Sequence, residues 1–209
     1  MIQAPANNVI VKVAKNWIKN PTDVARVSAA SDENTTIDLA DFVQIVGEVV
    51  SLPKYISKKS EYAGFTTNDI KPGDKVLFSY LVIFDTVKVG DAYRHRNGLT
   101  YEGKEYFAAN IKHIFAVIRE NEVKMINGWV MLNEVAEPKI IVPQHIKNAQ
   151  KCLVSEVLYI GELRAADVAP GDTVYFPKNA PQHYELNGKK FLILQQEKIL
   201  GKVDRDNEN

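Results

Sequence analysis

Hydrophobic and polar positions alternate along this chain in short runs, and helical spacing is scarce. In NVIVKV (residues 8–13) three valines fall on one face of an extended chain, while Ile10 and Lys12 fall on the other. Further runs of this kind are QIVGEVVSL (44–52), DKVLFSYLVIF (74–84), EYFAAN (105–110), HIFAVI (113–118), GWVMLNEV (128–135), CLVSEVLYIG (152–161), DTVYFP (172–177), FLIL (191–194) and ILGKV (199–203). Turn sequences such as KPGD and YEGKE separate them, so the pattern predicts an all-β protein with strands spaced as in small barrels.

The two halves of the sequence repeat each other in four blocks that keep the same order. The matching pairs are NVIVKV (8–13) with GWVMLN (128–133), VGEVVSL (46–52) with VSEVLYI (154–160), IKPGDKVLF (70–78) with VAPGDTVYF (168–176), and EGKEYFAANIKHIFAVI (102–118) with NGKKFLILQQEKILGKV (187–203). Such order indicates a duplication. We therefore expect two domains, residues 1–123 and 124–209, with the boundary in the charged stretch RENEVKM (119–125).

The connections differ between the two copies. The first copy has a long link at residues 14–41 and extra sequence at 53–69 and 79–98, whereas the second is compact except around KIIVPQ (139–144). Loops of this length are seldom idle, because binding residues are commonly carried on loops of a rigid scaffold. These segments are where we expect function.

Composition excludes several classes of function. The chain has 209 residues with 26 Lys and Arg against 26 Asp and Glu, so its formal net charge is zero and a nucleic-acid partner is not expected. No apolar run approaches the roughly 18 residues of a membrane-spanning helix, and the N-terminus does not have the pattern of a secretion signal. Cys152 is the single cysteine, which excludes an internal disulfide and predicts a cytoplasmic protein.

Residues that would carry catalysis or bind a metal do not form a recognisable motif. The four histidines lie far apart in the sequence, and neither a Gly-rich phosphate loop nor a G-x-S-x-G elbow is present. YRHRN (93–97) clusters two arginines and a histidine, which suits either an anion site or a solvated loop tip. We therefore expect no catalytic residues, no metal and no cofactor, and the chain does not read as an enzyme.

The stretch APGDTVYFPKNAPQHYELNGKKFLILQQEKILGKVD (169–204) resembles the second half of a GroES-type co-chaperonin, of the chaperonin-10 family. The first copy keeps PGDKVLF, EGKEYF and IFAVI, a weaker form of the same pattern. The resemblance implies two tandem GroES-like, small, partly open β-barrels with long loops, as in the chloroplast co-chaperonin or phage-encoded versions. The related barrel of zinc alcohol dehydrogenases also has the Pro-Gly-Asp turn, but this chain lacks that family's Cys/His set and dinucleotide-binding half.

KIIVPQ contains three aliphatic side chains in a polar segment, followed by a proline: Ile140, Ile141, Val142 and Pro143. The resemblance implies that this is the family's mobile loop, whose aliphatic triplet docks into a groove on the chaperonin ring. An apolar triplet that cannot fold alone gains its burial on meeting such a groove, which agrees with the same role. The alternative is that the triplet forms a short buried strand.

The first copy departs from this pattern. Its nearest candidate for a docking loop is Ile37 with Leu39, interrupted by Asp38, so that loop is either degenerate or a weak second contact. Residues 53–69 lie where the family has a roof hairpin, and the second copy has almost nothing there.

Two functions are consistent with these features. The first is a co-chaperonin that self-associates into a ring-shaped lid, binds a GroEL-type chaperonin ring through the mobile loop, and assists ATP-dependent protein folding. The second is a GroES-like barrel protein used as a structural or assembly component, for instance of a virion. An exposed aliphatic loop favours the first, because a purely structural protein gains nothing from it.

Overall fold

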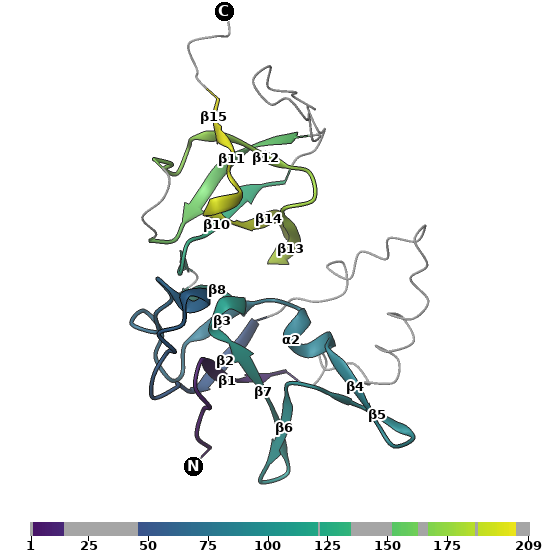
Figure 1. Ribbon diagram of the computed structural model, residues 1–209. Helices are drawn as coiled ribbons and strands as arrows, with labels where there is room; N and C mark the ends of the chain where they lie inside the picture. Colours follow the sequence, from purple (N-terminus) through teal and green to yellow (C-terminus); the bar gives the residue numbers. More distant parts are fainter. Residues whose placement is uncertain are drawn as a thin grey trace, which may run out of the picture. The chain divides into compact units, whose positions relative to one another are not determined.

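The computed structural model describes residues 2–14, 46–120, 122–134, 152–162, 167–186 and 188–203. The chain divides into two compact units, Met1–Glu122 and Val123–Asn209. Each unit is built on its own antiparallel β-sheet (Figure 1). The expectation of an all-β fold with two β units is confirmed.

The first unit contains most of a seven-stranded sheet with the order β6-β7-β1-β2-β3-β8-β9, and a separate two-stranded sheet formed by β4 and β5. Its strands are β1 (Asn8–Val13), β2 (Val46–Ser51), β3 (Lys75–Phe78), β4 (Thr86–Val89), β5 (Ala92–His95), β6 (Gly98–Tyr101), β7 (Lys104–Asn110) and β8 (Ile114–Arg119). The helices among its described residues are each a single turn: η3 (Ser60–Tyr62), α2 (Leu81–Phe84) and η4 (Ile111–His113). β9 (Glu122–Met125) begins where the two units divide.

The second unit contains a six-stranded sheet with the order β13-β14-β10-β11-β12-β15. Its elements are β10 (Trp129–Asn133), β11 (Cys152–Ile160), β12 (Thr173–Pro177), β13 (Gln182–Leu186), β14 (Lys189–Gln195), the 3₁₀ turn η5 (Gln196–Lys198) and β15 (Gly201–Lys202). Its hydrophobic core cluster is aliphatic apart from one phenylalanine. The buried members are Val130, Leu132, Leu153, Val157, Val174, Phe176, Leu192 and Leu194.

The two units share one topology. In strand order, β6-β7-β1-β2-β3-β8 of the first unit corresponds to β13-β14-β10-β11-β12-β15 of the second, and in each a 3₁₀ turn precedes the last strand. The first two strands of each unit are also joined with a β-bulge, which falls at equivalent places of the second strand, between Val49 and Ser51 and between Val157 and Tyr159. A bulge adds one unpaired residue to a strand, so its recurrence is a further feature that the two sheets share.

The Pro-Gly-Asp turns of the two units form the same backbone hydrogen bonds. In the first unit the Gly73 amide donates to the Val49 carbonyl (2.8 Å), and the Val49 amide donates to the Asp74 carbonyl (2.8 Å). In the second, Gly171 and Val157 form the same bond at the same length. Both glycines have φ near +90°, a conformation that favours glycine, so the turn depends on this residue in each copy.

One strand expectation is wrong in part. DKVLFSYLVIF was expected to be extended throughout, but β3 ends at Phe78 and the following aliphatics form the single turn α2. The Ser79 amide bonds the His113 carbonyl and its hydroxyl accepts the Leu81 amide, which turns the chain out of the sheet. Val82 and Ile83 are buried by this turn, so an apolar run of this length does not distinguish strand from helix.

Candidate functional site

The residues predicted to dock on a partner lie outside the described residues. Ile140, Ile141, Val142 and Pro143 fall in the undescribed segment 135–151, while Ile37 and Leu39 fall in the undescribed segment 15–45. What the structure does describe is the pair of strands that bounds each segment. Both segments join two neighbouring antiparallel strands, β10 to β11 in the second unit and β1 to β2 in the first.

Hydrogen bonds lock the two strands together where segment 135–151 leaves the second unit. The Ser155 hydroxyl donates to the carbonyl of Asn133 (2.7 Å), and the Asn133 amide donates to a carboxylate oxygen of Glu156 (2.9 Å). Cys152, the first described residue after the segment, is fully buried and pairs with Pro177 of β12. This thiol is therefore part of the packing, and the ends of the segment are held at fixed positions on the sheet.

Close packing fixes the equivalent strand ends in the first unit. Gly47 pairs with Val13, and a Cβ at Gly47 would lie 2.9 Å from the Phe78 ring. Val46 pairs with Leu77 of β3. The end of β3 therefore lies beside the strand end at which segment 15–45 joins the sheet.

Ion pairs brace the Pro-Gly-Asp turns at the sheet margins. Arg119 donates from Nε to one Asp74 oxygen (2.8 Å) and from a terminal nitrogen to the other (2.5 Å), while the Lys71 amide also bonds this carboxylate (2.7 Å). These hydrogen bonds, with Arg119 first, hold the pKa of Asp74 below its usual range. In the second unit Lys202 bonds Asp172 (2.9 Å), which raises the pKa of Lys202.

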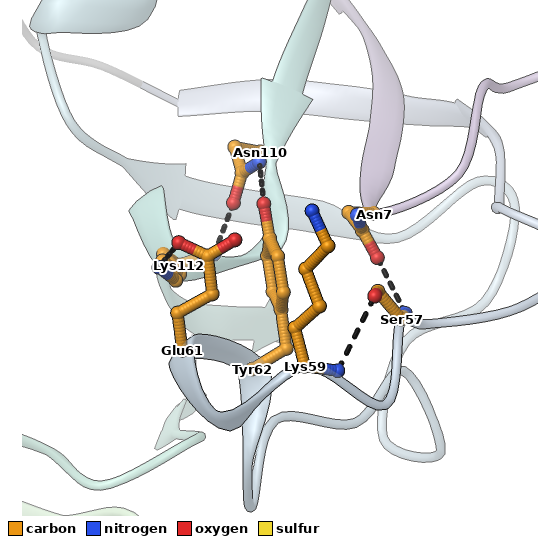
Figure 2. A network of polar contacts seen from close by, with 7 residues as sticks. All are labelled: Asn7, Ser57, Lys59, Glu61, Tyr62, Asn110 and Lys112. Carbon is orange, nitrogen blue, oxygen red and sulfur yellow. Dashed lines mark hydrogen bonds and ion pairs between the residues drawn. The ribbon is translucent and has the colours of Figure 1, made fainter.

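Residues 53–69, where a roof hairpin was expected by resemblance, fold back onto the first unit (Figure 2). The Ser57 amide donates to the Asn7 side chain (2.6 Å), and the Asn110 amide donates to the Tyr62 hydroxyl (3.1 Å). Lys112 bonds Glu61 (3.4 Å) and lies 4.5 Å from the centre of the Tyr62 ring. The segment contains one 3₁₀ turn and no strand pair in its described form, so it is an attached strap rather than a projecting hairpin.

The YRHRN cluster does not converge on a common point. His95 is buried, and its Nδ1 lies 2.6 Å from the Ile83 carbonyl, whereas Arg96 forms an ion pair with Asp85 (2.9 Å). Arg94 lies on the opposite face of β5 from His95, since successive strand residues alternate. These side chains anchor an insertion instead of gripping an anion.

A pocket of about 410 Å³ lies in the first unit where α2 faces β7. It is lined by Asn8, Tyr80, Leu81, Val82, Phe84, Asp85, Asn97, Ala108, Asn110 and His113. Burial lowers the pKa of His113, so its imidazole is neutral near pH 7. Asn110 and Asp85 already bond Tyr62 and Arg96, so the polar groups at this hollow serve mainly to hold the insertion and the strap in place.

The described part of the chain shows neither a cluster of metal-ligating side chains nor a membrane-spanning helix. Its His, Cys, Asp and Glu side chains nowhere gather in a group of three or more that would hold a metal ion. No helix among the described residues is long and apolar enough to cross a membrane.

Sequence reasoning missed one element of the first unit. Residues 79–97 form α2 and the β4–β5 hairpin. The sequence pattern predicts only extra sequence here, with a strand that continues to residue 84. The signal available was the pair Gly90-Asp91 between two short β-prone runs, a common hairpin turn.

Comparison with known proteins finds one protein family and two relatives that resemble this chain. Residues 123–203 match the family described as the chaperonin 10 Kd subunit. The co-chaperonin GroES of Allochromatium vinosum is 31% identical over 88 residues, which cover 42% of this chain and 88% of that protein. The co-chaperonin GroES of Myxococcus xanthus is 38% identical over 45 residues, which cover 22% of this chain and 47% of that protein.

Proposed function

This chain belongs to the chaperonin-10 family of GroES co-chaperonins, and from that premise we propose that it is itself a co-chaperonin. It forms a ring-shaped lid on a GroEL-type chaperonin and closes a chamber for ATP-dependent protein folding. The family is not one of enzymes, so ATP hydrolysis is the work of the partner.

One observation carries the proposal. The matched residues 123–203 include both strands that bound segment 135–151, so the aliphatic triplet Ile140–Val142 belongs to the connection between the first two strands of the matched domain. Its polar neighbours give it few apolar partners within the segment, and Pro143 restricts the backbone directly after it. These features suit a loop that orders on an apolar groove of a partner.

The energetics require several loops to act together. Burying Ile140, Ile141 and Val142 yields roughly 1.5–3 kcal/mol each before ordering costs are subtracted. A single loop therefore binds weakly, whereas a ring that presents several loops to one partner binds tightly through effective concentration. We infer that self-association into a ring is part of the function.

We also propose that the first unit is a second, modified GroES-like domain, which makes this a tandem co-chaperonin with domains near 1–123 and 124–209. The support is the shared strand order, the shared bulge and the identical turn hydrogen bonds of the two units. Its loop is a weaker contact through Ile37 and Leu39, because Asp38 interrupts the apolar run.

The alternative, a structural or assembly component such as a virion part, has one observation in its favour. The family match covers the second unit only, and the first carries insertions that the second lacks. In that case Ile140–Val142 has no groove to enter.

Capping of a purified GroEL-type chaperonin by the full chain decides between the two. We expect the protein to co-elute with the chaperonin ring in the presence of ATP and to dissociate when nucleotide is removed. A chain that forms stable oligomers yet never associates with the chaperonin, with or without ATP, contradicts the co-chaperonin and supports the structural alternative. A species that stays monomeric at micromolar concentration contradicts the ring.

A further inference from the structure

In the connection after β3 the first unit carries a hairpin that is absent from the corresponding, fully described connection of the second unit. In the second unit β12 ends at Pro177 and β13 begins at Gln182, so residues 178–181 connect them. In the first unit the corresponding connection, residues 79–97, contains α2 and the β4–β5 hairpin. Figure 1 shows this hairpin extending away from α2 and the sheet of its unit.

Buried polar contacts hold the base of the hairpin. The His95 ring lies 2.6 Å from the Ile83 carbonyl and packs edge-on against Phe107, with ring centres 5.4 Å apart. The Asn97 amide donates to the Val82 carbonyl (3.1 Å), and the Arg96 amide donates to the Asp85 carbonyl (2.8 Å). An isolated two-stranded hairpin is marginally stable in water, so these anchors are what keep it in one position.

The hairpin and α2 expose an unusual share of apolar surface. Seven large hydrophobic side chains are exposed among the described residues, and four of them lie in this insertion: Leu81, Val87, Val89 and Tyr93. Val87 stands opposite Arg94 and Val89 stands opposite Ala92, and residues directly opposite share a face. One face of the hairpin is therefore apolar with an arginine beside it, and no described residue covers it.

The insertion leaves the sheet at the end where the first unit would present its loop. β3 runs into the insertion after Phe78, and Leu77 of β3 pairs with Val46, the first described residue after segment 15–45. The second unit shows the same relation, since Cys152, directly after segment 135–151, pairs with Pro177. The hairpin thus arises beside the strand ends that carry the proposed docking loop.

Charge indicates what covers this face. Lys88 and Arg94 stand in the middle of β4 and β5, Asp91 is the only acidic residue of the hairpin, and Arg96 is paired with Asp85. Two copies joined along β4 would bring their Lys88 side chains together, and two copies joined along β5 would do the same with Arg94. Like charges across strands are destabilising, so the arrangement disfavours a second copy and favours an acidic surface.

We propose that the β4–β5 hairpin is a second chaperonin contact, in which the face with Val87 and Val89 packs on an apolar, acid-rimmed surface of the chaperonin ring. This rests on the proposed co-chaperonin function. In this proposal the hairpin gives the first unit a preformed contact. It takes the place of an uninterrupted aliphatic triplet, which the sequence of residues 14–41 does not contain.

The test is capping of a purified GroEL-type ring by the full chain carrying Val87→Asp and Val89→Asp together. Both side chains are exposed, so the barrels stay folded, and we expect the affinity for the ring to fall by about tenfold or more. The matched control is Tyr55→Asp, which changes the most exposed large hydrophobic side chain, 66% exposed, beyond the opposite end of β2. It should cap normally.

A second variant, Arg94→Glu, keeps both valines and reverses the charge that shares their face, and Lys88→Glu, on the opposite face of β4, is its control. For Arg94→Glu we expect slower association and a weaker dependence of the rate on salt. This variant also keeps the proposal falsifiable if the valine variant does not fold.

The outcomes separate this proposal from the function on which it rests. Normal capping by the valine variant, or capping strengthened by the charge reversal, overturns the hairpin contact alone. Loss of ring assembly by the valine variant in the absence of chaperonin also overturns it, because the occupant is then a second copy. Failure of the unaltered protein to cap overturns the co-chaperonin and the hairpin contact together.

Discussion

The two units use one six-stranded frame and differ in what they attach to it. Both hold the Pro-Gly-Asp turn by the same pair of 2.8 Å backbone bonds and end with a 3₁₀ turn before the last strand. The first unit adds the strap at 53–69 and the hairpin at 86–95, while the second keeps short connections and the aliphatic triplet. The frame can therefore stay constant while the connections between its strands diverge. The strands then provide stability, and the connections provide the surfaces that recognise a partner.

The comparison is tested most strongly at the two loops. We expect Ile141→Asp to leave the protein folded and to abolish capping, because a charge would enter an apolar groove in every subunit at once. Ile37→Asp in the first unit should have a smaller effect. Co-elution with the chaperonin ring measures capping, and circular dichroism measures folding.

Two results would contradict this reading of the loops. If Ile141→Asp unfolds the second unit, the triplet is part of the core. If the variant folds and still caps normally, the loop is not the docking element.

We expect the next largest effect at two glycines, Gly47 in β2 and Gly161 directly after β11, and it is an effect on stability. A Cβ at Gly161 would lie 2.8–2.9 Å from backbone atoms of Ile126, which cannot move aside as a side chain can. We expect Gly161→Ala to destabilise the second unit by about 2 kcal/mol. Urea unfolding followed by Trp129 fluorescence measures it, in a background where Trp17→Phe removes the other tryptophan.

A matched pair of variants sharpens this result. Gly47→Ala crowds Phe78 in the first unit. It should lower the urea midpoint followed by far-ultraviolet circular dichroism and leave the midpoint followed by Trp129 fluorescence unchanged. Glu162→Ala, an exposed neighbour of Gly161, should change neither. A Trp129 midpoint that moves equally in Gly47→Ala shows that the units unfold together.

The smallest expected difference between the two units is in how their stability depends on pH. In the first unit burial lowers the pKa of His113, and Arg119 lowers that of Asp74. The unfolded chain therefore binds protons first: stability falls below about pH 6.5 as His113 is forced to charge, and falls again below about pH 4 as Asp74 is protonated. In the second unit Asp172 raises the pKa of Lys202, so that contribution is lost only as pH rises above about 10.4.

Hydrogen exchange at several pH values, resolved by segment, measures this difference. His113→Gln should flatten the loss that begins near neutral pH, and Asp74→Asn should flatten the loss at lower pH. Equal acid sensitivity of both units, unchanged in these variants, would show that the titration of other groups dominates.

Much of the frame was predictable because its signals are local. The valines of β1 alternate with the period of a strand, and the Pro-Gly-Asp turns at 72–74 and 170–172 need no distant contact to be recognised. The order of the repeated blocks likewise predicted two copies of one arrangement. The docking residues Ile140–Pro143 and Ile37 with Leu39 remain predictions, because they lie outside the described residues.

The sequence by itself determined the all-β class, the repeat and the family, through alternation and turn residues that act over a few positions. Only the tertiary structure decided the strap and the hairpin. Asn110 reaches Tyr62 from 48 positions away, and His95 reaches Ile83 from 12, across surfaces that exist only once the sheet has formed. The hairpin strands are exposed on most of both faces, so they carry no burial pattern, and the contacts that hold them are polar bonds whose partners the local sequence does not reveal.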